Sequence, residues 1–271
     1  MSLEFRTLQP EEFYRQHLSG GERPDGRGLH ERRPVTISSR HIIRSADGSA
    51  VVKCGHTTVV CGVRAELTSP GPDHPDQGYI VPNFTFANSS LGASVAGVHA
   101  TQRMSQFLLT VLDTSQCINT RDLCIKSGHY VWVLYIDLVC LDQAGNLMDT
   151  AVTAMIAALD NVTLPNVSVD DESNEVKVST KNRHKLKLLN HPSSSSVVIF
   201  SNSDNPSCPY LVSDPTEEEE NLSSSLVTVV TVDDEVCHLI NPGGELLTPT
   251  LLQQTVSLAF KRTKPNCDKV S

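Results

Sequence analysis

The chain has 271 residues, enough to bury a sizeable core in one large domain or in two smaller lobes. Its 22 basic and 31 acidic residues give a net charge of −9, which argues against autonomous binding of RNA or DNA unless partners supply the positive charge. No apolar run approaches the roughly 18 residues of a membrane span and no signal-peptide pattern follows Met1, so we expect an intracellular protein without a membrane segment.

The N-terminal region predicts a short helix followed by a turn. A helix over Leu8–Leu18 is favoured because Pro10 suits a first helical turn, and because Glu11 and Glu12 complement the positive end of a helix. Two glycines then end the helix. The next segment, Arg23–Arg27 (RPDGR), has the composition of a surface β-turn when it is considered alone.

The next part of the chain predicts a β-hairpin. After a first strand at Val35–Ser38, two β-rich runs at Asp47–Cys54 and Thr57–Leu67 are joined by a two-residue turn that begins with Gly55. Two further segments have the composition of exposed loops, namely Ser69–Gly78 and Asn88–Gly97. A helix is predicted over Thr101–Asp113, where the apolar residues follow a helical stripe: Met104, Phe107, Leu108, Val111 and Leu112.

The segment Val131–Leu159 is expected to form the structural centre. It begins with an apolar run long enough for a strand that is buried on both faces, turns through Asp142–Asn146, and continues as a small, apolar helix. Asp149 is the predicted N-cap, and Pro165 requires the helix to have ended. In many α/β proteins, a junction of this kind holds an anion at the helix N-terminus.

The C-terminal half predicts short strands and one last helix. Turn or loop composition marks Ser193–Ser196 and Ser201–Pro209, and the last helix begins at Thr248-Pro249. The side chains of that helix that we expect to face the core are Leu251, Leu252, Val256 and Phe260. The predicted strands are Glu175–Thr180, Ser196–Phe200, Tyr210–Ser213, Leu226–Val232 and Val236–Ile240.

Neither the cysteines nor the histidines follow a metal-site spacing. The eight cysteines form no C-x-x-C pair, and Cys54, Cys61 and Cys140 stand in apolar strand-like runs, which favours buried, reduced thiols. The ten histidines form no H-x-x-x-H or H-E-x-x-H pair. We therefore predict no metal and no cofactor.

Four segments in order resemble the RNase PH family of phosphorolytic exoribonucleases and its descendants in the ring of the RNA exosome. They are Arg23–Arg27 (RPDGR), Asp47–Val63, the central Val131–Leu159, and Leu211–Glu219 (LVSDPTEEE). The run Asp122–Asp142 is similar to one branch of eukaryotic ring subunits. The resemblance implies an α/β fold of two lobes, each of mixed sheet with packed helices, like ribosomal S5 domain 2.

The expected organisation has four parts. Residues 1–30 form the N-terminal helix and RPDGR arm, residues 31–168 the first RNase PH-like lobe, residues 169–262 the second lobe, and residues 263–271 a polar tail.

Phosphorolysis requires a site that offsets several negative charges, together with an acid that manages protons at the leaving oxygen. In active relatives, the central turn reads D-G-G-T-R-T-A, and its Thr and Arg hold the phosphate. The resemblance places Leu147 and Met148 at those two positions, and Asp149 adds a carboxylate at the helix N-terminus. A like-charge contact at a few Å costs about 4 kcal/mol at an effective dielectric of about 20. We therefore predict that the phosphate site is degenerate.

Two further family positions bear on catalysis and RNA binding. Active relatives carry arginines along the helix that corresponds to Ser105–Asp113, where this chain has none; Arg103, just before it, is the remaining candidate for an RNA contact, although a solvated charge is the commoner role. The acids of a D-L-x-Y-x-E-D run in active relatives match Asp214 and Glu220. An acidic run after a strand is equally typical of a solvated turn.

The leading hypothesis is a non-catalytic subunit of the exosome's hexameric ring. The resemblance implies a hetero-oligomer with other RNase PH-like subunits and RNA-binding cap subunits, RNA threaded through the channel, and residence in nucleus, nucleolus and cytoplasm. The alternative is an active phosphate-dependent 3′-to-5′ exoribonuclease that uses Asp214 and Glu220. A third possibility, an independent RNA-binding module, conflicts with the net charge of −9.

Overall fold

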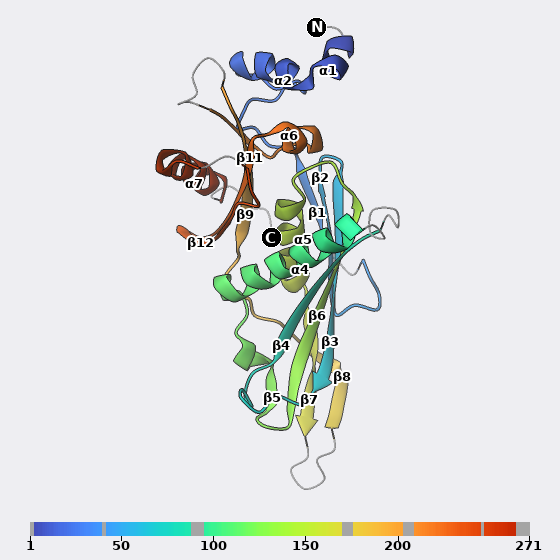
Figure 1. Cartoon of the computed structure of the whole chain (residues 1–271). Helices are drawn as coiled ribbons and strands as arrows, with labels where there is room; N and C mark the ends of the chain where they lie inside the picture. Colours follow the sequence, from blue (N-terminus) through green and yellow to red (C-terminus); the bar gives the residue numbers. More distant parts are fainter. Residues whose placement is uncertain are drawn as a thin grey trace.

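The computed structural model describes residues 3–39, 42–87, 95–169, 176–202, 209–244 and 247–263 (Figure 1). The predicted polar tail lies almost entirely outside the described residues, as does most of the Asn88–Gly97 segment. None of the helices in the described ranges is long and apolar enough to cross a membrane.

The first lobe is built on a six-stranded sheet. Its order is β1-β2-β3-β6-β4, with the short β5 paired to β6, and only the β4–β6 pair among these is parallel. The strands are β1 (Val35–Ser38), β2 (Gly48–Cys54), β3 (Thr57–Thr68), β4 (Tyr79–Phe86), β5 (Cys124–Lys126) and β6 (Tyr130–Asp142). The 3₁₀-helix η1 (Thr120–Leu123) precedes β5, and a separate hairpin of β7 (Thr163–Val169) and β8 (Val176–Lys185) follows.

The second lobe is built on a four-stranded antiparallel sheet of order β10-β9-β11-β12. Its strands are β9 (Ser193–Phe200), β10 (Tyr210–Ser213), β11 (Ser225–Val232) and β12 (Glu235–Ile240). The short helix α6 (Glu217–Leu222) connects β10 to β11, and α7 (Pro249–Thr263) packs on one face of the sheet, against β9 and β11.

Two helices lie between the sheets and join the lobes. Helix α5 (Leu147–Leu159) packs on β2 and β3 of the first sheet and on β9 of the second, and α4 (Val95–Ser115) packs on β4, β11 and β12 (Figure 1). The alanines of α5 allow this close packing, and Gly48 of β2 permits it on the sheet side, since a Cβ there would lie 2.7 Å from the Ala158 carbonyl oxygen. The largest apolar cluster therefore contains residues of both sheets.

The N-terminal arm covers one end of the second lobe. Helices α1 (Leu3–Leu8) and α2 (Pro10–Ser19) follow each other, with Pro10 at the start of α2 as expected. Leu18 of α2 is buried with Val198, Phe200 and Val212 of the second sheet. The ring of Tyr14 stacks on that of Phe200 at 6.3 Å between centroids.

The α/β fold with two main sheets and packed helices confirms the expectation, and most predicted elements are present. Cys54, Cys61 and Cys140 are buried, reduced thiols, as predicted, and burial raises the pKa of Cys140 to about 11.

Several details were wrong. Helix α4 begins at Val95, so the end of the expected Asn88–Gly97 loop is helical. The serines of Ser193–Ser196 form the start of β9 rather than a turn. In α7, Val256 packs against the apolar cluster of the second sheet as expected, but the fully buried residues are Thr255 and Ala259, which were not predicted, and Leu251, Leu252 and Phe260 are only half-buried. Strands β4 and β7 were not predicted.

Candidate functional site at the junction of the lobes

The turn between β6 and α5 has an unusual backbone. Gly145 and Asn146 both adopt left-handed conformations, with φ of +84° and +55°. Glycine is required at the first position, since a Cβ would lie 2.4 Å from the backbone nitrogen of Glu217. The turn is therefore pressed directly against the start of α6 in the second lobe.

The α5 N-terminus lies at this turn, but its cap is not the predicted one. Asn146 occupies the N-cap position, and Asp149 lies in the first helical turn. The Asp149 carboxylate is buried and accepts hydrogen bonds from the Ser194 hydroxyl (2.7 Å), the Ser196 hydroxyl (2.8 Å) and the Ser196 backbone N–H (3.0 Å). The carboxylate thus fastens α5 to β9, which explains why a serine-rich segment forms a buried strand.

Leu147 and Met148 complete the first turn of α5 as apolar residues. Both are half-buried and pack against the main core. The Thr228 hydroxyl of β11 lies 3.4 Å from the Met148 sulfur. Neither side chain offers an N–H or O–H group to an anion.

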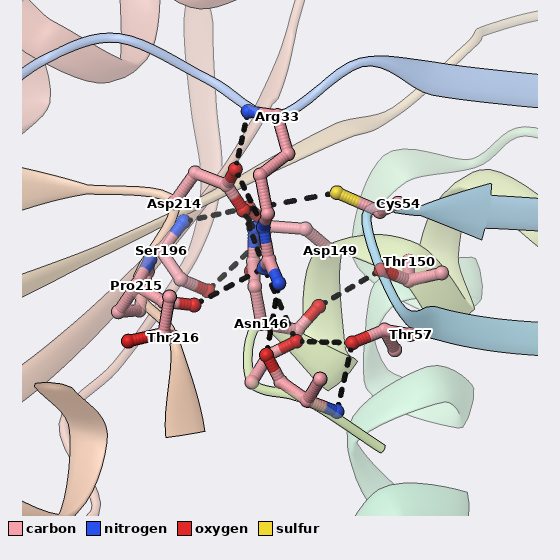
Figure 2. Close-up of polar contacts among 12 residues, drawn as sticks. Arg33, Cys54, Thr57, Asn146, Asp149, Thr150, Ser196, Asp214, Pro215 and Thr216 are labelled. Carbon is pink, nitrogen blue, oxygen red and sulfur yellow. Dashed lines mark hydrogen bonds and ion pairs between the residues drawn. The ribbon is translucent and has the colours of Figure 1, made fainter. Parts of the chain in front are cut away.

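Asp214 is the centre of the junction. It follows β10 in a left-handed conformation (φ +52°) and is fully buried. Its carboxylate accepts hydrogen bonds from the Arg33 backbone N–H (2.8 Å), from the Arg33 guanidinium (2.9 and 3.1 Å) and from the Asn146 amide (Figure 2). Burial alone would raise the pKa of Asp214, but the hydrogen bonds and charge of Arg33 outweigh it and hold the pKa well below its usual range.

Arg33 connects the two lobes. Besides Asp214, its guanidinium donates to the carbonyl oxygens of Ala144 (2.8 Å), Gly145 (3.3 Å) and Pro215 (3.1 Å). The Thr57 hydroxyl supports the same turn, because it donates to the Gly145 oxygen (2.7 Å) and accepts from the Ala144 N–H (3.1 Å). The turn is therefore held from both sides by the chain's own polar groups (Figure 2).

The RPDGR segment is more than a surface turn. A turn does form, but Arg23 is only 2% exposed. Its guanidinium donates to the carbonyl oxygens of Ser213 and Asp214 and forms an ion pair of 3.4 Å with Glu219. Arg27 lies 3.2 Å from the Asp214 carboxylate and also pairs with Asp25 at 2.6 Å. The expectation of a simple surface β-turn was wrong because the arm folds onto the end of β10.

The acidic run after Asp214 divides into two exposed and two inward-facing residues. Glu217 and Glu218 are exposed, whereas Glu219 is buried and forms a reciprocal capping box with Thr216. Glu220 is half-buried and accepts a hydrogen bond from the Asn146 N–H at 2.6 Å. Burial raises the pKa of Glu220 to about 7, with a further contribution from the nearby Asp149 charge.

Each of the three arginines at the junction is paired with a carboxylate. The guanidinium groups of Arg23, Arg27 and Arg33 face three carboxylates, those of Asp25, Asp214 and Glu219. Two N–H groups, Arg23 Nε and Arg27 Nη2, have no partner within the described residues, but each belongs to a side chain whose charge is already paired. Among the described residues of the junction, the three guanidinium groups are thus already engaged by the chain's own carboxylates.

The remaining candidate, Arg103, is exposed on α4 and contributes to none of the junction contacts described above. In the described ranges, no group of three or more histidine, cysteine or acidic side chains is placed to hold a metal. The predicted site residues Asp214 and Glu220 and the α5 turn all lie at this junction. Arg33 and Thr57 were not predicted, because they carry no local motif and their partners lie far away in the sequence.

Comparisons with known proteins agree with this architecture. The sequence matches the 3′ exoribonuclease family, with domain 1 over residues 31–165 and domain 2 over residues 190–262. It is 31% identical over 258 residues to exosome complex component rrp43 of Schizosaccharomyces pombe, covering 94% of this chain and 93% of that protein. It is also 31% identical to exosome complex component Rrp42 of Methanopyrus kandleri, and that match covers 91% of this chain and 90% of the relative.

Solved structures give the same result. The fold superposes on an archaeal exosome core with a TM-score of 0.79 and 28% identity, over 96% of this chain and 95% of the other. For the Archaeoglobus fulgidus exosome with RNA bound to the active site, the TM-score is 0.82 and the identity is 28%. That match covers 96% of this chain and 97% of the other. With both domains matched in order across two sheets joined by α4 and α5, the chain belongs to the 3′ exoribonuclease (RNase PH) family, as an RNase PH-like relative of exosome ring subunits.

Proposed function

We propose that this chain is a non-catalytic structural subunit of the RNase PH-like ring of an RNA exosome. In this role, it scaffolds the ring and the RNA channel and so supports 3′-to-5′ RNA processing and degradation by the complex. Its partners are other RNase PH-like ring subunits and RNA-binding cap subunits, in a hetero-oligomer.

The observation that carries the proposal is the internal use of the junction's polar groups. Asp149 is bound to the serines of β9, Asp214 to Arg33 and Arg27, and Leu147 and Met148 are packed on the core. A phosphate entering at the α5 N-terminus would meet the buried Asp149 carboxylate, and the guanidinium groups that the structure describes at the junction are already paired with carboxylates. Transition-state stabilisation of phosphoryl transfer needs such positive groups in place beforehand.

A phosphorolysis assay tests the non-catalytic role. The full chain, alone and co-expressed with its ring partners, is incubated with single-stranded RNA and inorganic phosphate, and nucleoside diphosphates are measured. We expect that this chain contributes no phosphate-dependent release of nucleoside diphosphates. We also expect the chain to be more soluble when it is co-expressed with ring subunits, and a stable monomer indifferent to them would contradict the scaffold role.

The alternative, an active phosphorolytic enzyme using Asp214 and Glu220, is favoured by one observation. The raised pKa of Glu220, about 7, suits a general acid near neutral pH. Glu220→Gln is the appropriate variant, since Glu220 is half-buried at the edge of the junction while Asp214 is a buried ion-pair partner. Phosphate-dependent release that this substitution abolishes would establish the enzyme and refute the scaffold.

We also propose that the protein resides in the nucleus, nucleolus and cytoplasm, because it resembles exosome ring subunits. Imaging of the tagged full chain at its natural expression level tests it. Exclusion from the nucleus would contradict this part of the proposal.

A further inference from the structure

A hollow lies on the second lobe, beside the junction, between α7 and β10. Its volume is about 640 Å³. The floor is apolar and half-buried, and the rim is formed by polar side chains of α7 (Figure 1 shows α7 on the side of the second sheet opposite α5). The floor consists of Leu29, Pro209, Leu211 and Leu258, and the α7 rim includes Gln253, Gln254, Ser257 and Lys261.

The hollow adjoins an edge strand whose backbone is not fully paired. β10 is the last strand of its sheet and hydrogen-bonds to β9 on one side. The Asp214 N–H points to β9, where it donates to Ser196, while the Ser213 N–H points away and donates to the Leu29 oxygen at 3.0 Å. Because backbone groups alternate along a strand, the N–H and C=O of Leu211 also point away from β9. They have no partner within the part of the chain that the structure describes.

The hollow differs in charge from the rest of the molecule. The chain has nine more acidic than basic residues, yet the hollow is lined by Lys261 and His30 and by no Asp or Glu. Desolvation and the charges of Arg23 and Lys261 lower the pKa of His30, which disfavours its charged form. Lys261 is then the charge that an incoming segment meets.

A free strand edge beside an apolar hollow and a helix is the arrangement by which extended peptides add to a sheet, with backbone hydrogen bonds for affinity and a side-chain hollow for specificity. We propose that β10 and α7 bind an extended acidic segment of a partner protein. The segment pairs with the Leu211 backbone, places an apolar side chain between Leu211 and Leu258, and directs an Asp or Glu to Lys261. This inference does not depend on whether the chain is catalytic.

Selection from a phage-displayed library of short random peptides tests the proposal, with the full chain, co-expressed with ring subunits if it requires them, as the target. We expect the enriched peptides to carry an apolar residue and an acidic residue two positions apart, because alternate residues of a strand share a face. Their binding is then measured on variants. Lys261→Glu should weaken it about tenfold, since it turns an attraction into a repulsion.

Two further variants separate the components of the site. Leu211→Pro removes the free N–H at an edge position, where proline is tolerated, and should reduce binding by about tenfold or more. If that variant does not fold, Ser257→Trp, which fills the hollow from the exposed side of α7, replaces it. Lys187→Glu is the matched control because it makes the same charge change at an exposed residue outside the hollow.

The proposal would be supported if Lys261→Glu and Leu211→Pro lose peptide binding while Lys187→Glu binds the peptides as the natural chain does. Enriched peptides that bind Lys261→Glu and Leu211→Pro as tightly as the natural chain would overturn the proposal. A single-stranded RNA that binds with the same dependence on Lys261 would also overturn it, because it would identify the occupant as a nucleic acid.

Discussion

Replacing Asp214 by asparagine should destabilise the protein strongly. Asparagine has nearly the same shape and also tolerates the left-handed conformation, so the change isolates the charge. It leaves two guanidinium groups, those of Arg33 and Arg27, without their shared buried carboxylate at 2.9 and 3.2 Å. Breaking a buried ion pair by removing one partner costs about 3–5 kcal/mol. We expect a loss of that size in the free energy of unfolding.

The measurement is urea unfolding followed by fluorescence of Trp132, the single tryptophan of the chain, which is buried in β6. The matched control is Asp137→Asn. Asp137 pairs with Arg64 at a similar distance, 3.3 Å, but both side chains are about half exposed (41% and 52%). Exposed pairs contribute at most about 1 kcal/mol, so the control should unfold close to the natural chain.

The pH dependence provides a second readout. The pKa of Asp214 is lower in the folded state than its unfolded value of about 3.9, so its contribution is complete above that pH and is lost as the pH falls toward the folded value. The stability gap between the natural chain and Asp214→Asn should therefore be constant near neutrality and narrow below about pH 4. A gap under about 1 kcal/mol at neutral pH, or one that widens on acidification, would refute the ion-pair account.

Three other substitutions probe the same junction. Asp149→Ala removes three hydrogen bonds accepted by a charged group, and should cost about 3 kcal/mol and speed amide exchange at Ser196; unchanged exchange would contradict its role between α5 and β9. Gly145→Ala should cost about 3 kcal/mol or more in urea unfolding, because the added Cβ would clash with the start of α6. The control Gly128→Ala has a similar φ of +78° but lies in open space, so it should cost only about 1 kcal/mol. Equal costs for the two variants would exclude the contact between Gly145 and α6. The folded pKa of Glu220, about 7, lies above its unfolded value of about 4.3, so ionisation reduces stability as the pH rises between these values. Glu220→Gln should lessen the fall in stability between about pH 5 and pH 8, and an unaltered fall would contradict the raised pKa.

The elements that could be predicted from the sequence are those that local chemistry determines. The long apolar run of β6 and the alanine-rich α5 can be predicted from the sequence, because elements that are buried on all sides consist of apolar and small residues. β4 was not predicted because it is an edge strand, where Pro82 interrupts an otherwise alternating pattern. The start of β9 looks like a loop because serines favour turns, and the partner that binds the buried Ser194 and Ser196, Asp149, is distant in the sequence.

The candidate site was predicted in part for the same reason. The residues at the α5 turn and after β10 were found because they occupy family positions. The interactions of these residues were not predicted. From the neighbouring residues alone, Asp149 could equally be an N-cap and Asp214 a free acid. The partner of Asp214 is Arg33, 181 residues earlier in the chain, and no local pattern connects the two.

The N-terminal arm has a consequence for how the protein folds during synthesis. Arg23 and Arg33 are made early, but their partners Asp214 and Glu219 lie 181 to 196 residues later. The first lobe can bury much of its sheet before those carboxylates leave the ribosome, because a nascent chain folds from its N-terminal side. Closure of the junction is then among the last steps, with the arginines solvated until the second sheet forms. A chain truncated before Asp214 would accordingly keep a folded first sheet and an unattached arm.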